Sequence, residues 1–323
     1  NKPFSEYRKY FFRYASEFGF QSFPSVKTLE TVTDDPKELN PFSYVMEKHQ
    51  RNYGGNGKIA KYMQAAYRYP ENFSDFVYAS QLLQADGIRY GVEHYRRNRG
   101  RCMGAIYWQL NDCWPVISWS SIDYYGRWKA LHYYAKRFFA PVMLSCEEQS
   151  WMTVEADMNR QHFEFEKSIR LNVTNETLDA HRVLVKWAVR KTDATILREE
   201  EQWLEVPALS AVWMDKVELP QIDCFNEYVS YEAWENDQII SQGTVIFSYP
   251  KYFHYLNPGL AVRVDGDEIV VKAEAYAKSV EIRNENDDLI LEDNYFDMNA
   301  GEYRVKILDG KPDGLKVRSV YDI

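Results

Sequence analysis

The sequence has few of the residues that mark a metal-binding or disulfide-linked protein. Its 323 residues include four cysteines, Cys102, Cys113, Cys146 and Cys224, and none of them are at CxxC spacing. The six histidines are scattered and form neither HExxH nor HxH. Because zinc sites and disulfide frameworks need such spacings, we expect buried free thiols and no structural metal.

Long apolar runs and a signal peptide are also missing. No apolar run approaches the ~18 residues needed to cross a membrane. The opening residues NKPFSEYRKYF lack the layout of a secretory signal and read like mid-domain sequence. We therefore expect no membrane partner. We also expect that further sequence lies upstream of Asn1. Localisation is undetermined, with the cytoplasm favoured.

The net charge of −9 is unevenly distributed. Residues 1–147 contain 20 Lys and Arg against 14 Asp and Glu, whereas the remainder contains 19 against 34. This change indicates a domain boundary near 147, and the length suggests two or three domains. The basic residues of the first part form no clustered stripe, so a nucleic-acid partner is not expected.

Residues 1–147 read as alternating helices and short strands. The pattern predicts a long helix over 74–97 and another over 128–139. Between them, CMGAIYWQL (102–110) is almost continuously apolar, which is typical of a fully buried parallel strand. A strand, a long helical connection, a strand and a helix follow the logic of a parallel α/β sheet.

The rest of the chain reads as two all-β domains. Apolar and polar residues alternate over 163–173, which predicts a half-buried antiparallel strand. Further short strands follow, and about 100 residues of this kind fit an immunoglobulin-like sandwich over 148–250. A linker that contains two prolines leads into a second, smaller β-sandwich domain over 251–323.

Two short segments carry unusual residues together. Glu17 lies in the aromatic stretch YASEFGFQSFPS (14–25), and IYWQLNDCWP (106–115) contains Trp108, Asn111 and Asp112. Functional groups in a parallel α/β barrel lie at the carboxyl ends of strands. Aromatic faces stack on sugar rings, polar side chains bind sugar hydroxyls, and glycoside hydrolysis needs two carboxyl groups.

These residues leave two interpretations open. One is a carbohydrate-active α/β barrel. The other is structural: the aromatic residues form barrel core, and Glu17 forms an ion pair with Arg13 or Arg101. Asp112 likewise has a structural alternative, an ion pair inside the barrel mouth.

The segments SEFGFQSFPS (16–25) and GAIYWQLNDCWPVISWSSIDYYGRWKALHYYAKRFFAPV (104–142) closely resemble the β-mannosidases of the β-galactosidase-like clan of retaining glycoside hydrolases, glycoside hydrolase family 2. The resemblance extends more weakly through the β domains. It implies a multidomain α/β plus all-β fold: the C-terminal part of a (β/α)₈ TIM barrel over 1–147, followed by the two β-sandwich domains.

The resemblance also implies roles for individual residues. Glu17 corresponds to the catalytic nucleophile of the family's S-E-[FY]-G motif, and Trp108 lines the pocket for the terminal sugar. Asn111 and Asp112 fall in the same segment and shape that pocket. Arg127, Lys129, Arg137 and His132 are assigned to the surface or to helix contacts. The resemblance implies an oligosaccharide substrate. It implies neither a metal nor an organic cofactor.

One part of the family pattern is missing. The general acid/base is a Glu after Asn at the end of the fourth barrel strand, and a complete barrel needs ~250 residues. The pairs Asn175–Glu176, Asn226–Glu227 and Asn284–Glu285 all lie in the β domains. We therefore expect a C-terminal fragment, inactive alone, whose partner is the N-terminal part of the same protein.

The resemblance leaves the activity itself partly open. It implies removal of terminal β-mannosyl residues by double displacement. The alternatives are a related exo-β-glucosaminidase or endo-β-mannosidase of the same clan, and a non-catalytic carbohydrate-binding or scaffold fragment.

Overall fold

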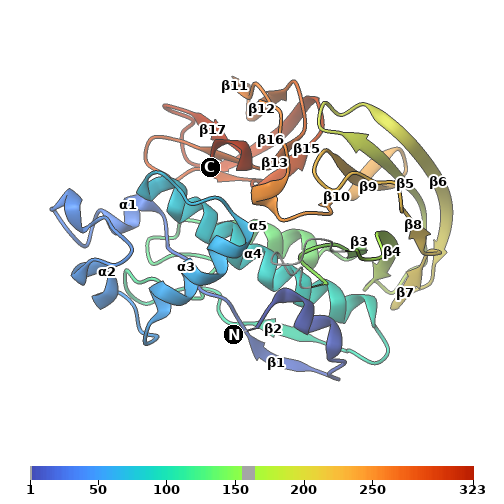
Figure 1. Ribbon diagram of the computed structural model, residues 1–323, viewed down its shortest axis with the longest axis horizontal. Coiled ribbons are helices and arrows are strands. Elements are labelled where there is room, and N and C mark those ends of the chain that lie inside the picture. The colour runs from blue at the N-terminus through green and yellow to red at the C-terminus, as the bar shows by residue number, and fades with distance from the viewer. Residues whose placement is uncertain (1, 155–163) are drawn as a thin grey trace. The chain divides into compact units, whose positions relative to one another are not determined.

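The computed structural model describes residues 2–154 and 164–323 (Figure 1). The chain divides into two compact units, each built from three separate stretches. Unit 1 contains Asn1–Ser16, Arg89–Ile106 and Lys136–His254. Unit 2 contains Glu17–Ile88, Tyr107–Ala135 and Tyr255–Ile323. The three-domain division proposed from the sequence, at 147/148 and 250/251, remains a prediction.

The α-helices of the described residues lie in the first part of the chain. They are α1 (Val26–Leu29), α2 (Tyr44–Lys48), α3 (Gly55–Ala66), α4 (Phe73–Arg97) and α5 (Ala130–Phe138), with short 3₁₀ turns at Phe4–Lys9, Pro36–Glu38, Pro250–Tyr252 and Val320–Asp322. The long cyan helix in Figure 1 is α4, and it confirms the helix predicted over 74–97. Unit 2 contains its residues up to Ile88, and unit 1 the remainder.

Strands β1 (Ala15–Phe18) and β2 (Ala105–Tyr107) form a two-stranded sheet. The Met103 amide donates a hydrogen bond to the Arg13 carbonyl, and the Trp108 amide donates to the Phe18 carbonyl, each at 2.8 Å. The residue numbers of the bonded pairs increase in the same direction along both segments. The strands are therefore parallel, as predicted. The predicted full burial of 102–110 is wrong, since Ile106 is 49% exposed. Among the described strands β2 pairs with β1 alone, which leaves much of it uncovered.

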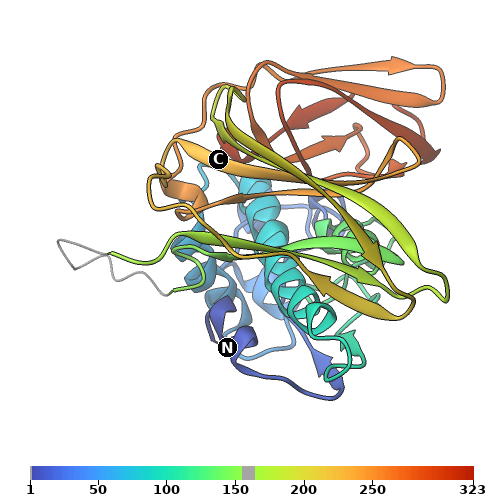
Figure 2. The ribbon, with the colours of Figure 1, turned by 90° about the vertical axis from the view of Figure 1, so that its right-hand side faces the viewer.

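Unit 1 contains a β-sandwich of two antiparallel sheets, ordered β3-β4-β7, with β8 also on β4, and β10-β9-β5-β6. Figure 2 shows its long strands, coloured green to orange. The strands are β3 (Val142–Gln149), β4 (Ser168–Asn175), β5 (His181–Lys191), β6 (Ile196–Val206), β7 (Ser210–Trp213), β8 (Val217–Glu218), β9 (Glu227–Glu235) and β10 (Gln238–Ile246). Alternate residues of both sheets, such as Val173 and Val185, fill a common apolar core.

The strand predicted over 163–173 is observed as β4, and Phe163 lies outside the described residues. Ile169 and Leu171 are buried, as the alternation predicts. Asn172 and Thr174 are buried as well, so the expectation of a half-buried strand is wrong. The Thr174 hydroxyl donates to Oδ1 of Asn172 at 3.0 Å, and this bond offsets part of their desolvation.

Unit 2 contains the second group of strands. They are β11 (Ala261–Asp265), β12 (Glu268–Ala273), β13 (Ala277–Arg283), β14 (Ile290–Leu291), β15 (Phe296–Met298), β16 (Gly301–Asp309) and β17 (Lys316–Arg318). They form antiparallel sheets ordered β11-β12-β16-β14 and β15-β13-β17. The two all-β groups therefore match the coarse fold class predicted from the sequence.

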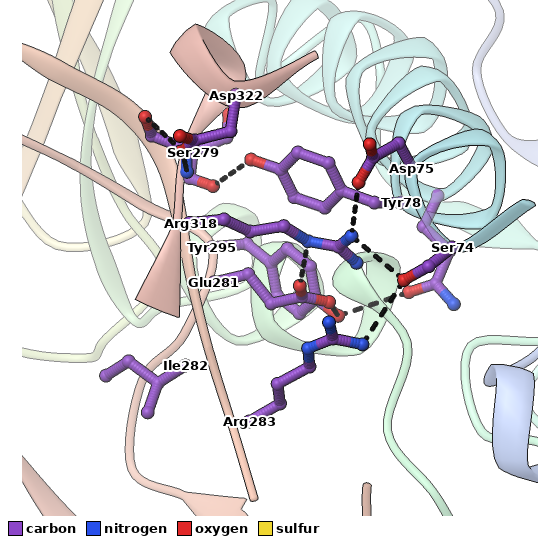
Figure 3. Close-up of polar contacts among 12 residues, drawn as sticks. Ser74, Asp75, Tyr78, Ser279, Glu281, Ile282, Arg283, Tyr295, Arg318 and Asp322 are labelled. Carbon is purple, nitrogen blue, oxygen red and sulfur yellow. Dashed lines mark hydrogen bonds and ion pairs between the residues drawn. The ribbon is translucent and has the colours of Figure 1, made fainter. Parts of the chain in front are cut away.

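A buried ionic cluster joins β13 and β17 to helix α4 within unit 2 (Figure 3). Arg318 donates to Asp75 at 2.8 Å and to Ser74 at 3.1 Å. Its guanidinium also forms an ion pair with Glu281, which accepts a second bond from Tyr295 at 2.8 Å. Because every charge in the cluster has a partner, its burial is tolerated and fixes the helix against the strands.

Candidate active site

The candidate site lies in unit 2, where β1 and β2 end. Glu17 is the penultimate residue of β1, and its side chain is exposed. The Glu17 carboxylate has no hydrogen-bond or ion-pair partner among the described residues. The two arginines considered as alternative partners, Arg13 and Arg101, belong to unit 1.

Trp108 follows β2 directly and is 47% exposed. Its backbone amide donates to the Phe18 carbonyl at 2.8 Å, and its peptide bond with Gln109 is cis. A Cβ atom at Gly19 would lie 2.3 Å from the Trp108 carbonyl oxygen and 2.9 Å from the Trp119 ring. Only glycine fits this close approach, which brings the segment after Glu17 against the segment that carries Trp108.

Asn111 and Asp112 lie in the same segment but in different environments. Asn111 is exposed, and its carbonyl accepts a bond from the Gln109 side chain at 3.0 Å. Asp112 is buried, and both of its carboxylate oxygens accept hydrogen bonds, from Gln109 at 3.0 Å and from Ser118 at 2.8 Å. Asp112 therefore orders the polar loop after β2.

A polar layer below these loops connects them. Gln84 of α4 donates from its amide nitrogen to the carbonyls of Phe20 and Trp119, both at 2.9 Å. Its amide oxygen accepts a bond from the Ser22 hydroxyl at 2.6 Å. A single helix residue thus holds the loop after β1 and the loop after β2 together.

Lys129 also belongs to this layer, so its predicted place at the surface or in a helix contact is wrong. The side chain is 1% exposed. Its Nζ donates to the carbonyls of Ser22 at 3.3 Å and of Ser118 at 3.5 Å. Burial lowers the pKa of Lys129 to about 7, although the carboxylates of Asp112 and Asp123 raise it. No feature of the local sequence distinguishes this lysine from an exposed one.

A hydroxyl network lies beside the same loop. Ser121 contacts the Tyr107 hydroxyl at 2.8 Å and Nδ1 of His132 at 3.2 Å. Burial raises the pKa of Tyr107 and lowers the pKa of His132, so both groups are favoured in their neutral forms. These residues support the loop without adding charge to it.

The described residues contain no group of three or more His, Cys, Asp or Glu side chains placed to hold a metal ion. No helix in the described part of the chain is long and apolar enough to span a membrane. The arrangement instead presents the exposed carboxylate of Glu17 on a strand that pairs with the strand leading to the exposed Trp108. That combination is suited to nucleophilic chemistry on a ligand with an apolar face.

Comparison with known proteins finds similarity to β-mannosidases and to a domain family named for mannosidases. Residues 167–252 match the family described as Mannosidase Ig/CBM-like domain, and residues 255–323 match the family described as Ig-fold domain. Beta-mannosidase B of Thermothelomyces thermophilus is 30% identical over 337 residues, which covers 96% of this chain and 39% of that protein. Over almost its whole length, the chain is similar to this β-mannosidase.

Two further matches extend this relationship. The beta-mannosidase of Capra hircus is 39% identical over 144 residues, covering 41% of this chain and 16% of that protein. The crystal structure of a beta-D-mannosidase from Dictyoglomus thermophilum superposes with a TM-score of 0.84 at 25% identity, covering 98% of this chain and 38% of that one.

More distant likeness is confined to the fold. An exo-chitosanase of Amycolatopsis orientalis superposes with a TM-score of 0.68 at 16% identity, over 98% of this chain and 45% of that one. Two β-mannosidases match this chain over more than nine-tenths of its residues, and the chain spans about two-fifths of their length.

Proposed function

We propose that this chain carries part of the active site of a retaining glycoside hydrolase that removes terminal β-mannosyl residues from oligosaccharides, with Glu17 as the nucleophile. The observation that carries the proposal is the position of Glu17. Its carboxylate is exposed, unpaired among the described residues, and placed at the end of a parallel strand beside the strand that leads to Trp108. The relationship to the β-mannosidases supplies the substrate class.

The same proposal assigns β1 and β2 to a (β/α)₈ barrel. Two parallel strands joined through helical segments, with a further helix after β2, have the order of elements found in such barrels. Glu17 and Trp108 lie at the carboxyl ends of these strands, which is where barrel enzymes position their functional groups. The domain division is then barrel (1–147), sandwich (148–250) and smaller sandwich (251–323).

In the proposed reaction, a carboxylate oxygen of Glu17 attacks the anomeric carbon of the terminal mannosyl unit. A bond forms between them as the glycosidic bond breaks, and a second carboxylic acid protonates the departing oxygen. That second group then takes a proton from water, and the water oxygen displaces Glu17 from the sugar. An exposed carboxylate that is already free of ion pairs suits the attacking role.

The neighbouring residues have distinct roles in this proposal. The exposed Trp108 ring stacks on the apolar face of the sugar, and Asn111, which is also exposed, binds a sugar hydroxyl. Asp112 acts indirectly, since its buried carboxylate is occupied by Gln109 and Ser118 and holds the loop in shape.

The acid/base partner is proposed to come from residues outside this sequence. In a retaining enzyme the two carboxyl groups are ~5–5.5 Å apart. Glu176 pairs with Arg99 at 3.0 Å in unit 1, and Glu227 begins strand β9 of the same unit. Glu285 lies after β13, where its amide binds the Asp313 carbonyl. None of these glutamates follows a strand of the proposed barrel.

The first test is Glu17→Gln in the complete protein, assayed on p-nitrophenyl β-mannoside. The amide cannot form the glycosyl–enzyme bond, so turnover should fall by roughly 1,000-fold or more. Glu30→Gln is the matched control, because Glu30 is an exposed carboxylate close in sequence to Glu17 that forms an ion pair with Lys27 at 3.1 Å.

Wild-type turnover by Glu17→Gln would reject the nucleophile assignment. Turnover by the purified 323-residue chain alone would reject an acid/base from elsewhere in the protein. A preference for the p-nitrophenyl β-glucosaminide would replace the mannosidase with an exo-β-glucosaminidase, and cleavage restricted to internal bonds would indicate an endo-β-mannosidase.

A further inference from the structure

Lys129 is a buried cation with no part in the proposed chemistry. It lies just before helix α5 and is among the largest fully buried side chains of the chain. Taking an ammonium group out of water costs several kcal/mol even after relaxation. An apolar side chain of the same length would avoid that penalty, so the charge itself needs an explanation.

The contacts of Lys129 join the two loops of the candidate site. Its ammonium lies at the antiparallel bridge between Ser22 and Ser118, where the Ser22 amide also donates to the Ser118 carbonyl at 3.0 Å. Ser22 follows Glu17 by five residues in the loop after β1. Ser118 belongs to the loop that begins with Trp108. One cation therefore draws carbonyl oxygens from both loops to the same point.

The nearby carboxylates extend this connection toward the sugar pocket. Asp112 and Asp123 are the acidic groups that face the ammonium. Asp112 binds the side chain of Gln109 at 3.0 Å, and Gln109 is the residue bonded to Trp108. The backbone amide of Gln109 donates to the Trp119 carbonyl at 3.1 Å. The carboxylate that orients the Trp108 segment thus also raises the pKa of Lys129 and favours its charged form.

We propose that Lys129 is a positioning residue of this site, whose buried ammonium group fixes the loop after Glu17 and the loop after Trp108 against each other. The proposal rests on the proposed glycosidase function. In this proposal the buried charge of Lys129 lowers the stability of the fold. It is kept because it aligns the nucleophile with the sugar-binding ring.

The expected signature is a separation of activity from stability. Lys129→Met in the complete protein should lower kcat/KM on p-nitrophenyl β-mannoside by about 10- to 100-fold at pH 6, because a small misplacement of reacting groups has effects of this size. Its Tm should equal or exceed that of the wild type, since a buried charge is replaced by an apolar chain of similar length.

The pH dependence of stability gives a second readout. The pKa of Lys129 is about 7 in the folded protein and lies near ~10.4 in the unfolded chain. Between these values the unfolded state binds the extra proton, so wild-type stability rises with pH. The stability advantage of Lys129→Met should therefore be largest at pH 6 and shrink toward pH 9.

Lys278→Met is the matched control. Lys278 is also a buried lysine of unit 2, but it forms an ion pair with Asp297 at 3.1 Å on the C-terminal sheets. Its loss should lower Tm and leave kcat/KM unchanged. If Lys129→Met behaves like this control, or keeps wild-type kcat/KM at pH 6, the positioning role is overturned.

Hydrogen exchange separates this proposal from the proposed function. In Lys129→Met the amides of Ser22 and Gln109 should exchange faster, because Ser22 donates from the loop after β1 to the Ser118 carbonyl and Gln109 donates to the Trp119 carbonyl within the loop after β2. Unchanged exchange overturns the positioning role even if Glu17→Gln is inactive. Faster exchange together with a fully active Glu17→Gln supports the positioning role and rejects the glycosidase assignment.

Discussion

Gly19 shows how much of this site depends on the size of one residue. The Trp108 carbonyl, a backbone atom, occupies the space that a Cβ at Gly19 would take. Backbone atoms cannot rotate away as a flexible side chain can, so any larger residue must push β1 and the Trp108 segment apart. The contact between the two candidate catalytic segments is therefore limited by sterics as well as by hydrogen bonds.

Gly19→Ala is expected to destabilise the protein by about 1–3 kcal/mol, the usual range for overpacking a tight contact. It should also reduce activity in the complete protein, because Trp108 moves relative to Glu17. Urea unfolding measures the first effect, and kcat/KM on a β-mannoside measures the second.

Gly57→Ala provides the control. Gly57 lies inside α3, and a Cβ there would meet nothing within 4 Å. Alanine at this position should stabilise the protein by about 0.5–1 kcal/mol through its better helix propensity. Equal effects of the two substitutions would show that Gly19 makes no special contact.

At this scale the sequence predicted the exposed residues of the site better than the buried ones. It placed Glu17 and Trp108 at the ends of neighbouring strands because aromatic and acidic residues are visible in short motifs. It could not show that Lys129 is buried or that Asp112 is fully hydrogen-bonded. Those properties depend on Ser22, Gln109 and Ser118, which a linear pattern does not connect.

At the scale of elements, helix α4 was predicted to within one residue of its start, because its apolar residues recur with helical period. Strand β2 was predicted too long and too buried. An apolar run indicates how deeply a segment is buried when all of its neighbouring strands are present. In the described chain β2 extends only from Ala105 to Tyr107 and pairs with β1.

Strand β6 is the edge of its sheet and carries the run Glu199, Glu200 and Glu201 on exposed positions. Unpaired edges invite pairing with another chain, and charged side chains oppose it. Replacing the three glutamates with threonine should increase concentration-dependent aggregation, measured by light scattering. The free energy of unfolding should change by less than about 1 kcal/mol, since exposed ion pairs such as Lys186–Glu201 contribute little.

The triple substitution to lysine is the control for this prediction, because it restores charge of the opposite sign. It should stay as dispersed as the wild type. Equal aggregation of the threonine and lysine variants would show that the charge of β6 does not protect the edge.

At the scale of the whole molecule, the C-terminal strands complete unit 2 and are not an appendage to it. Arg318 pairs with Asp75 of α4, Tyr78 of the same helix donates to the Ser279 carbonyl, and the Tyr133 hydroxyl accepts from the Leu291 amide. These bonds bring residues far apart in the sequence into one buried layer.

Removal of residues 255–323 should therefore leave the rest of unit 2 without a stable fold. The exposed face of α4 would carry Tyr78 and Asp75 without partners, and we expect insoluble protein or loss of cooperative unfolding. Circular dichroism and urea titration of the soluble fraction test this. A truncated chain with wild-type unfolding would show that the C-terminal strands form an independent domain.

The interleaving of the chain between its two units has a consequence for biosynthesis. Unit 2 begins at Glu17 and ends at Ile323, with residues of unit 1 in between. A ribosome releases the chain from one end only, so the loops around Glu17 and Trp108 emerge long before the strands that complete their unit. We therefore expect the site to assemble only after the strands between Ala261 and Arg318 have been translated, and a chaperone that shields the aromatic first part during this interval should raise the yield of folded protein.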